Sequence, residues 1–556
     1  MANNVVQLSS QLYLKLDGRW QGPEIMDNLS EVVVDQHCHL PNMFTLRFFD
    51  QEATLIEGNR FSLQQEVELG AYGNGSQALV LMKGTITAVE PNFSADGSAE
   101  FVVRGYDQSF QLYRERHSKT YVNMRDSDIA TAVANEAGLT PRVEQTPLIY
   151  EHLYQHNQSD LSFLRERAWR IGYLCFVRDD TLHFVSSRRL GPPELTLTWG
   201  ENGLEIRPRL NTAERVDEVL VQGWNPDKQE AIIGRATSSD LNPQIGALQD
   251  IQDNPYTLTL TDMDIVNEVE ADLLAQARLD EHNAATVEME GSVFRQPALS
   301  AGAVIQIDGI GDQFGGNYLV TSATHVYTPS AGLETHFTVR GLRTGLLTEQ
   351  VDNRAPVQKH FGLVTAVVTN NRDPKGWGRV RVKFPWLSND AESCWARTMQ
   401  VAGQKAMPQV GDEVVVAFDD GHFNRPVVMG TLINGQNSDP PAYRRQQIPD
   451  TSGRKSWQSP AGHTIEMKDY NGEKQISVTT AGGQEIRLDD TNQAITLSTS
   501  GGLTIRLNDR TQTIEITSGR NVNIEGRGNV SLRATGDLNL EANGRVNMRG
   551  ANINFN

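Results

Sequence analysis

Residues 521–556 of the chain are NVNIEGRGNVSLRATGDLNLEANGRVNMRGANINFN. Apolar residues in this segment come in pairs two positions apart, and the pair recurs about every eight residues. Residues i and i+2 lie on the same face of a strand, so each pair indicates one very short strand with one apolar face. Gly528, Gly536 and Gly544 recur at one phase of the octad, where glycine permits the positive φ of a tight corner. A period this short is typical of a β-helix.

The same pairs continue upstream, where their spacing is wider. The steps between first members, starting from Ile465, are 11, 10, 9, 10, 9, 8, 8, 8, 8 and 7 residues. The pairs are Ile465/Met467, Ile476/Val478, Ile486/Leu488, Ile495/Leu497, Ile505/Leu507, Ile514/Ile516, Val522/Ile524, Val530/Leu532, Leu538/Leu540, Val546/Met548 and Ile553/Phe555. We therefore predict one repeat domain over residues 461–556.

Two apolar side chains per octad cannot fill a wide solenoid made by one chain. Three chains winding about one axis would bring six such side chains to a narrow dry core at each level, which predicts an intertwined trimeric β-helix on the order of 50 Å long. The alternative is an antiparallel β-meander. It would need turn pairs such as Asn-Gly at every corner, and the octads contain Asn-Gly-Arg once, at 543–545. The residues predicted to form the trimer core of the spike are Ile514, Ile516, Val522, Ile524, Val530, Leu532, Leu538, Leu540, Val546 and Met548.

Residues 356–436 have the pattern of a small all-β domain. Turns that contain Gly or Pro separate the expected strands, and five short strands in about 75 residues suit an OB-type barrel. The expected strands are 361–369, 379–386, 394–401, 412–418 and 426–433. A linker at 437–460 then leads to the repeat domain.

The first 355 residues mix strands with a few helices. Capping residues and apolar periodicity predict three helices. The first ends before Gly138 and has Asp126 or Ser127 as its cap, the second covers about 160–171 after Ser159, and the third covers about 264–282. Residues 173–185 are expected to form a hairpin around Asp179-Asp180.

Ordered motifs in the OB-type segment resemble a known family. They are GWGRVRVKFPW (376–386), SCWAR (393–397), MPQVGDEVVVAFDD (407–420) and RPVVMGTLI (425–433), followed by Asn434 and PPAY (440–443). Together they look like the OB domain of VgrG and of phage baseplate spike proteins. Further matches at 105–107, 118–121, 157–172 and 316–325 resemble the phage tail-hub (gene D) fold.

This resemblance implies a structural role. The family's fold is a pair of tail-hub β-barrel domains with helical insertions over 1–355, then the OB domain and the spike. It implies a homotrimeric central spike of a contractile injection system. Such a spike contacts inner tube and baseplate proteins, carries a PAAR-type tip protein and can carry effectors. It touches the target membrane only on firing. Ile553, Asn554, Phe555 and Asn556 are expected to bind the tip protein, because three copies of Phe555 would form an apolar triangle there.

Composition and charge exclude several other classes of function. With 50 Lys+Arg against 69 Asp+Glu, the net charge of −19 argues against a surface that neutralises nucleic-acid phosphates. Cys38, Cys175 and Cys394 make no disulfide framework or C-x-x-C motif, and the start MANNVV lacks the pattern of a signal peptide. We expect a protein made in the cytoplasm and assembled into a contractile particle that is extracellular or delivered into a target cell.

We predict no catalytic, cofactor or metal site. His37-Cys38-His39 on one strand cannot bring three ligands together, and the glycines of 309–316 are expected in a hairpin loop because a strand pattern follows them. Nothing in the sequence fixes Cys394 and His422 in a catalytic geometry, and Arg379 and Arg381 near Trp377 fit a solvated strand face better than a nucleic-acid groove.

Three settings remain open within the family. The short length and the turn DPKGWG (373–378) look most like extracellular phage-tail-like injection particles, followed by a type VI secretion VgrG and a true phage spike. A trimeric tail fibre that binds or degrades carbohydrate is the alternative from another class. It would be expected to show acidic and aromatic clusters on the rod, which has almost no aromatic residues between Tyr470 and Phe555.

Overall fold

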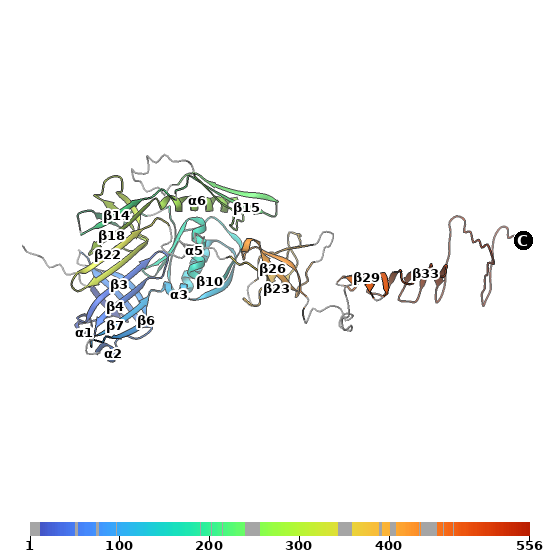
Figure 1. The fold of residues 1–556 in the computed structure, drawn as a ribbon, viewed down its shortest axis with the longest axis horizontal. Coiled ribbons are helices and arrows are strands. Elements are labelled where there is room, and N and C mark those ends of the chain that lie inside the picture. Colours follow the sequence, from blue (N-terminus) through green and yellow to red (C-terminus); the bar gives the residue numbers. More distant parts are fainter. Residues whose placement is uncertain are drawn as a thin grey trace, which may run out of the picture. The chain divides into compact units, whose positions relative to one another are not determined.

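The structure is a computed structural model in which strands dominate and a few helices are inserted, which confirms the mainly-β prediction (Figure 1). Two compact units, Met1–Asn437 and Ser438–Asn556, are described separately. The structure describes residues 12–50, 54–73, 77–95, 97–188, 191–201, 203–213, 215–239, 256–342, 359–387, 392–400, 407–432, 434, 453–459, 461–470 and 472–555.

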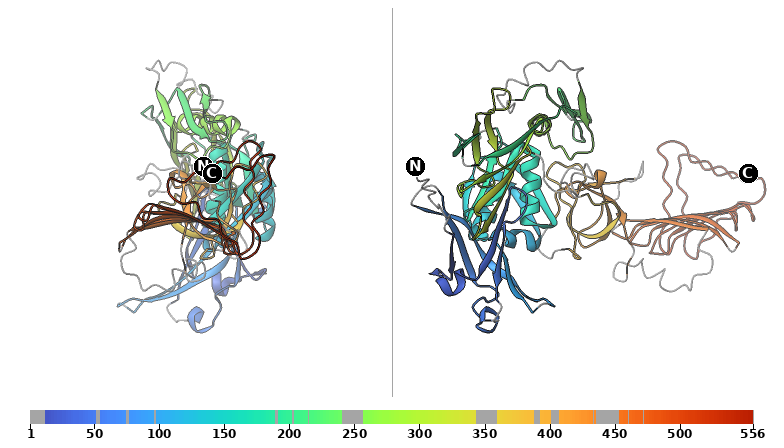
Figure 2. Two further views of the ribbon diagram at one scale, coloured as in Figure 1. Left: turned by 90° about the vertical axis from the view of Figure 1, so that its right-hand side faces the viewer. Right: turned by 60° about the vertical axis from the view of Figure 1, so that its left-hand side comes forward.

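The first unit is built on a large, mainly antiparallel sheet. It joins the N-terminal strands to strands more than 200 residues later, because β21 pairs along β3 with Ser322 opposite His37. Figure 2 shows the N-terminal strands in blue beside the yellow-green strands of the later segment. Its strands, in spatial order, are β14 (Glu205–Leu210), β18 (Val287–Phe294), β22 (Gly332–Val339), β21 (Ser322–Thr328), β3 (Leu29–His37), β4 (Met43–Phe49), β7 (Ala99–Tyr106), β6 (Ala78–Phe93), β5 (Glu66–Tyr72), β1 (Leu12–Leu16) and β2 (Arg19–Trp20).

Two apolar cores pack against this sheet. One gathers around Phe44, Leu46 and Phe48 in the N-terminal strands, and the other around Phe337 in the later strands. Smaller sheets extend the same region, which we call the hub (residues 12–342). They are β10 (Tyr150–Ser159) with β8 (Arg116–Met124); β11 (Tyr173–Arg178), β12 (Thr181–Ser186) and β9 (Thr140–Val143); β13 (Leu195–Thr198), β19 (Val304–Asp308) and β20 (Gly316–Leu319); and β16 (Glu230–Ala236), β15 (Glu218–Asn225) and β17 (Thr257–Leu260).

Two predicted hairpins in the hub are confirmed. β11 and β12 turn through Asp179 and Asp180, whose φ angles are +49° and +57°. The glycines of 309–316 lie between β19 and β20, which pair antiparallel, so this loop joins two strands and opens no helix for a phosphate.

The three predicted helices are present, with differences at their starts. They are α4 (Asp126–Glu136), α5 (Asp160–Ile171) and α6 (Glu268–Ala284); the shorter α1 (Pro23–Met26), α2 (Thr54–Glu57) and α3 (Ser109–Arg114) lie upstream. Ser159 caps α5 as predicted, since its Oγ accepts from the Ser162 amide at 3.3 Å. The cap predicted for α4 was wrong: Arg125 holds the N-cap position, and its amide donates to Asp128. α6 begins four residues later than predicted because Asn267 caps it.

The OB-type segment forms a five-stranded sheet, as predicted, with shorter strands. The strands are β24 (Arg381–Lys383), β23 (Val364–Asn370), β26 (Glu413–Phe418), β27 (Pro426–Thr431) and β25 (Arg397–Thr398), in spatial order. Their core includes Val368, Val382, Phe384 and Val414, and it also takes in Tyr154 from β10 of the hub. We call residues 359–434 the barrel.

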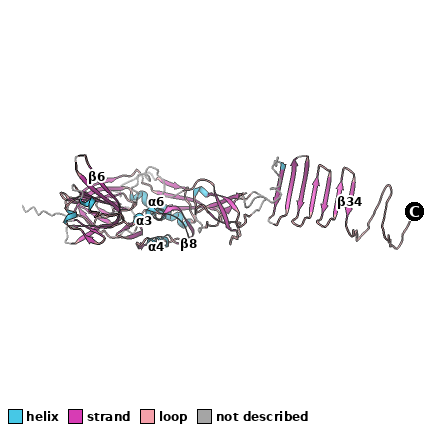
Figure 3. Ribbon diagram, turned by 90° about the horizontal axis from the view of Figure 1, so that it is seen from below, coloured by secondary structure: helices cyan, strands magenta, loops and turns pink. Residues whose placement is uncertain are grey.

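The second unit contains an antiparallel meander. Each strand pairs with the next along the chain, as Figure 3 shows for the zigzag that ends at β34. The strands are β28 (Arg454–Gln458), β29 (Thr464–Tyr470), β30 (Glu473–Thr479), β31 (Glu485–Asp489), β32 (Ala494–Ser498), β33 (Thr504–Asn508) and β34 (Thr513–Thr517). β28 falls within the predicted linker 437–460, of which 437–452 and 460 lie outside the described residues.

The strand pairing within the chain corresponds to the meander alternative for the first six apolar pairs. β29 to β34 carry the pairs from Ile465/Met467 to Ile514/Ile516. Across the described residues 518–555, which hold the remaining pairs, the single chain has no strand. Intertwining with other copies stays a prediction for this part.

Candidate functional site: an open apolar face on the C-terminal sheet

The pairing register of β28–β34 brings the predicted apolar pairs into two continuous rows. Ile486, for example, lies directly opposite Val478 on one side and Leu497 on the other. Directly opposed side chains on one face of a sheet contact one another. The first row is Trp457, Ile465, Val478, Ile486, Leu497, Ile505 and Ile516, and the second row is Met467, Ile476, Leu488, Ile495, Leu507 and Ile514. These two rows are the apolar face of the C-terminal sheet.

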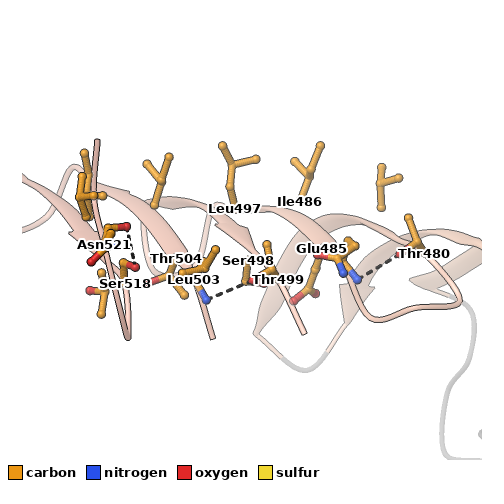
Figure 4. A pocket seen from close by; sticks show the side chains of 16 residues that line it. Thr480, Glu485, Ile486, Leu497, Ser498, Thr499, Leu503, Thr504, Ser518 and Asn521 are labelled. Carbon is orange, nitrogen blue, oxygen red and sulfur yellow. Dashed lines mark hydrogen bonds between the residues drawn. The ribbon is translucent and has the colours of Figure 1, made fainter. Parts of the chain in front are cut away.

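This apolar face is open in the single chain. From Ile465 to Leu507 the exposed fraction of its side chains, Met467 apart, lies between 40% and 48%, and Ile514 on the last strand reaches 74%. Figure 4 shows Ile486 and Leu497 projecting from the same side of the sheet. A continuous apolar surface of this kind marks an interaction site. Trp457 extends it onto β28, a strand that lies within the predicted linker.

The opposite face of the same sheet is polar. Its central row, again directly opposed, is Glu466, Ser477, Arg487, Thr496, Arg506 and Glu515. Arg454 pairs with Glu466 across β28 and β29, and Arg487 pairs with Glu485 at 2.7 Å. One face of the sheet is therefore apolar, and the other is polar and carries ion pairs.

The sequence between β29 and β30 holds an Asn-Gly pair, Asn471-Gly472, but the other turns of the meander form without one. In 480–484 and 499–503, a threonine Oγ1 accepts from the backbone amide four residues later, at 3.1 Å in both turns. Gly483 and Gly502 follow with φ of +82° and +81°, which glycine adopts without steric cost. Ser459 makes the same bond to the His463 amide. A meander therefore does not need Asn-Gly at every corner, since Thr-x-Gly-Gly forms two of these turns; the octad corners form no hairpin within the described chain.

A groove of about 530 Å³ lies between the first apolar row and these turns. The apolar side chains of Val478, Leu497 and Leu503 are part of its lining, and Thr480 and Thr499 lie at its edge (Figure 4). Among the described residues, this lining can bury apolar groups but holds no histidine or cysteine that could act in catalysis or bind a metal. The face is suited to packing.

The segment beyond β34 exposes every one of its predicted core side chains. The exposed fractions from Val522 to Phe555 range from 46% for Ile553 to 82% for Phe555. Asn554 at the predicted tip is exposed as well, and Asn556 lies outside the described residues. No further copy of the chain is present to cover these side chains, so the predicted core positions are untested.

The residues weighed as a metal or catalytic site are not brought together. Burial raises the pKa of Cys38 to about 12, and its Sγ faces the Val320 carbonyl oxygen at 3.6 Å. Cys394 donates to the Asn424 carbonyl at 3.1 Å, and burial raises its pKa to about 12, so it is a neutral thiol. His422 bonds elsewhere, to the Asp262 carbonyl at 3.1 Å. Over the described ranges no cluster of His, Cys, Asp and Glu could hold a metal ion.

The basic strand of the barrel is occupied by internal contacts. Arg379 pairs with Asp373 at 2.8 Å, and this hydrogen bonding holds the pKa of Asp373 well below its usual range. Arg381 stacks on Trp395 and pairs with Glu392 at 3.6 Å. These guanidinium groups are thus already neutralised, which disfavours a nucleic-acid groove. None of the helices in the described part of the chain is long and apolar enough to cross a membrane.

Comparisons with known proteins agree with the motifs. The chain is 32% identical over 153 residues to the type VI secretion system spike protein VgrG1c of Pseudomonas aeruginosa, and 31% identical over 147 residues to VgrG1b of the same organism. The type VI secretion system/phage-baseplate injector OB domain matches residues 364–432, and the Alg8 N-terminal domain matches residues 49–328, about half of the chain. The chain belongs to the Alg8 N-terminal domain family, and its curated homologues are VgrG spike proteins.

The family match to curated relatives is local, whereas the fold match is extensive. The aligned segments cover 24% and 23% of this chain and only 21% and 20%, about a fifth, of VgrG1c and VgrG1b. A chain in the structure of the Francisella PdpA-VgrG complex, in its lidded form, aligns over 93% of this chain and 81% of its own length. Its TM-score is 0.53 at 10% sequence identity, so this likeness shows a shared fold and nothing finer.

Proposed function

We propose that the protein is the structural central spike of a contractile injection system. The open apolar face of the C-terminal sheet is the observation that supports this most directly. A folded sheet with two apolar rows on one side and ion pairs on the other requires a partner for the apolar side. In this proposal the partners are two further copies of the same chain, and the hub contacts inner tube and baseplate proteins.

The energy of covering the apolar face favours association. Burying a large aliphatic side chain completely contributes about 1.5–3 kcal/mol. Because these side chains are already half-buried in the single chain, covering the rest contributes roughly 1 kcal/mol each. Summed over both rows this is on the order of 10 kcal/mol per chain before the entropic cost of association is subtracted.

Three copies would cover the apolar face of the meander and would also supply strand partners to the octad segment. Two sheets could also cover each other face to face, about 10 Å apart. Such a pair would not serve the octad segment, where the backbone of residues 522–555 has no strand partner within the described chain. Three chains winding about one axis give each short strand neighbours on both edges and place six apolar side chains at each level.

The proposed role includes partners that bind at the tip and is not enzymatic. Ile553 and Phe555 would present a threefold apolar surface to a PAAR-type tip protein, which, with bound effectors, would be carried to the target membrane. Cys394 and His422, the pair weighed for catalysis, bond to separate backbone carbonyls, which supports a non-catalytic role. We place the particle among extracellular phage-tail-like systems; the names of the curated relatives favour a type VI secretion VgrG as the alternative setting.

Native mass spectrometry of the purified full chain tests the proposal. One chain has a mass of 61.7 kDa, and the expected species has three times this mass at micromolar concentration. A folded monomer or a dimer at that concentration would overturn the proposal.

A further inference from the structure

The barrel is attached to the hub by a loop that inserts between hub elements. This loop, residues 419–425, leads into β27. The Tyr154 amide of β10 donates to Asn424 Oδ1 at 2.8 Å, and Arg425 pairs with Asp264 at 2.5 Å. The Phe423 ring packs on the Tyr154 ring at 4.8 Å between centroids. These contacts, together with the histidines described next, form the hub–barrel junction.

Four of the twelve histidines of the chain lie at this junction: His152, His156, His360 and His422. Two of them make hydrogen bonds that cross it. His152 Nε2 lies 2.9 Å from the Glu392 carbonyl of the barrel, and His422 Nε2 lies 3.1 Å from the Asp262 carbonyl of the hub. A carbonyl oxygen only accepts, so Nε2 carries the proton in both rings and Nδ1 is the nitrogen that acid would protonate.

The other two histidines are part of an aromatic cluster. The His156 ring stacks on Phe423 at 4.1 Å and meets the edge of His360 at 5.4 Å and of Trp386 at 6.3 Å. His156 is only 9% exposed. A charge on this ring would be desolvated, and a second charge on His360 would repel it.

The charged groups near these imidazoles do not compensate for burial. His152 faces Arg381, Glu151 and Glu392, and His422 faces Asp262, Asp264, Asp420, Lys359 and Arg170. Glu166 and Arg167 line the small cavity beside His156. Burial is still the largest influence, and it lowers the pKa of His152 and His422 below the usual value. For His156, burial and then His360 lower the pKa from 6.5 to about 4.

We propose that the hub–barrel junction is acid-sensitive: neutral imidazoles hold the 419–425 loop against β10, and mild acid releases the loop and uncouples the barrel from the hub. This would let the pH of the surroundings set how stiffly the barrel is connected to the hub, independently of how many copies assemble.

The direction and size of the effect follow from His156. The closed junction favours the neutral ring and the open junction allows the ordinary pKa, so junction stability is constant above about pH 7 and falls as the pH drops from 6.5 to about 4. At pH 5, an open-state pKa of 6.5 and a closed-state pKa of about 4 shift the closed-to-open ratio about 30-fold for this ring alone.

Hydrogen–deuterium exchange of the intact full-length protein at pH 7.5 and 5.0, corrected for the intrinsic rates, tests the proposal. Amides of β10 and of residues 419–425 should lose about 30-fold or more of their protection at pH 5.0. His156→Phe keeps the stacking on Phe423 but cannot titrate, so most of this loss should disappear. The matched control is His183→Phe. His183 is also buried, stacks on Phe176 at 4.6 Å within the hub and has a pKa lowered to about 4.

In the control variant the junction should still respond to pH as in the wild type. The proposal is overturned if the wild-type junction has the same amide protection at pH 5.0 as at pH 7.5. It is also overturned if His156→Phe loses as much protection at pH 5.0 as the wild type does. If His156→Phe does not fold, His156→Leu serves instead, because it keeps an apolar side chain against Phe423 and cannot titrate. An equal response in that variant and the wild type also counts against the acid-sensitive junction.

Discussion

Leu497→Asp should dissociate the proposed trimer while leaving each chain folded. Leu497 lies in the middle of the first apolar row, opposite Ile486 and Ile505, and is 42% exposed in the single chain. In the single chain the new carboxylate would reach water, so the meander should persist. Inside a trimer, three carboxylates would meet at one level of a dry core with no cationic partner.

The expected size of this effect can be worked from the exposed fraction. Removing the leucine forfeits roughly 1 kcal/mol of burial per chain, and desolvating the carboxylate costs about 2–3 kcal/mol more. Over three chains the loss is on the order of 10 kcal/mol, or about seven orders of magnitude in the association constant. Protonation would remove the charge, so the trimer should partly return near the ordinary carboxyl pKa of about 4.

Thr496→Asp on the same strand is the matched control. Thr496 lies on the polar face, opposite Arg487 and Arg506, where a carboxylate gains favourable partners. Native mass spectrometry and circular dichroism should show a folded monomer for Leu497→Asp and a trimer for Thr496→Asp. Equal trimer content and equal thermal midpoints in the two variants would show that the apolar face is not the interface.

Three further outcomes are expected. Leu538→Asp should lower the thermal midpoint of the tip segment and Asn539→Asp should not, since only Leu538 is predicted to lie in the trimer core; the reverse order in a melting series would mean that the face is misassigned. Deleting 551–556 should keep the trimer but abolish capture of the PAAR-type tip protein in a pull-down, and undiminished capture would exclude this tip site. Asp126→Ala should lower the free energy of unfolding, measured in urea, by about 3–5 kcal/mol. The reason is that Asp126 pairs with the buried Arg167 guanidinium at 2.6 Å, and the variant leaves that charge without this partner. A decrease below about 1 kcal/mol would contradict a stabilising role of the ion pair.

The sequence is sufficient to predict β29 to β34 of the C-terminal sheet but not β28, and not how the strands pair. A pair such as Ile486/Leu488 fixes one apolar face, and that face is the same whether the neighbouring strand comes from the same chain or from another copy. The residues of the turns decide whether a strand pairs with the next strand of its own chain, and Thr480-Ala481-Gly482-Gly483 is a turn that favours such pairing. A rule restricted to two-residue hairpin turns does not detect it.

The hub–barrel junction could not be predicted because its contacts are distant in the sequence. Residues 419–426 lie between the expected strands 412–418 and 426–433, and their sequence DDGHFNRP has the composition of a surface turn. Tyr154 and Asn424 are separated by 270 positions, and nothing local to either one indicates the other. By contrast, Ser159 and the glycine that ends α5, Gly172, act on their own helix, and both are visible as local signals.

The spacing of the apolar pairs accounts for the change along the second unit. β31 to β34 have five residues each, and steps of nine or ten residues leave four or five for a turn, as in 480–484. An octad with the same strand length leaves three residues, too few for the four- and five-residue turns that join β30 to β34. The chain stops pairing with itself where the step falls to eight, at Val522, and in the proposed trimer the segment beyond would wind around an axis shared with the other copies. In the proposed trimer, the meander would fix the register of the three chains, and the octad segment would extend that register to the tip.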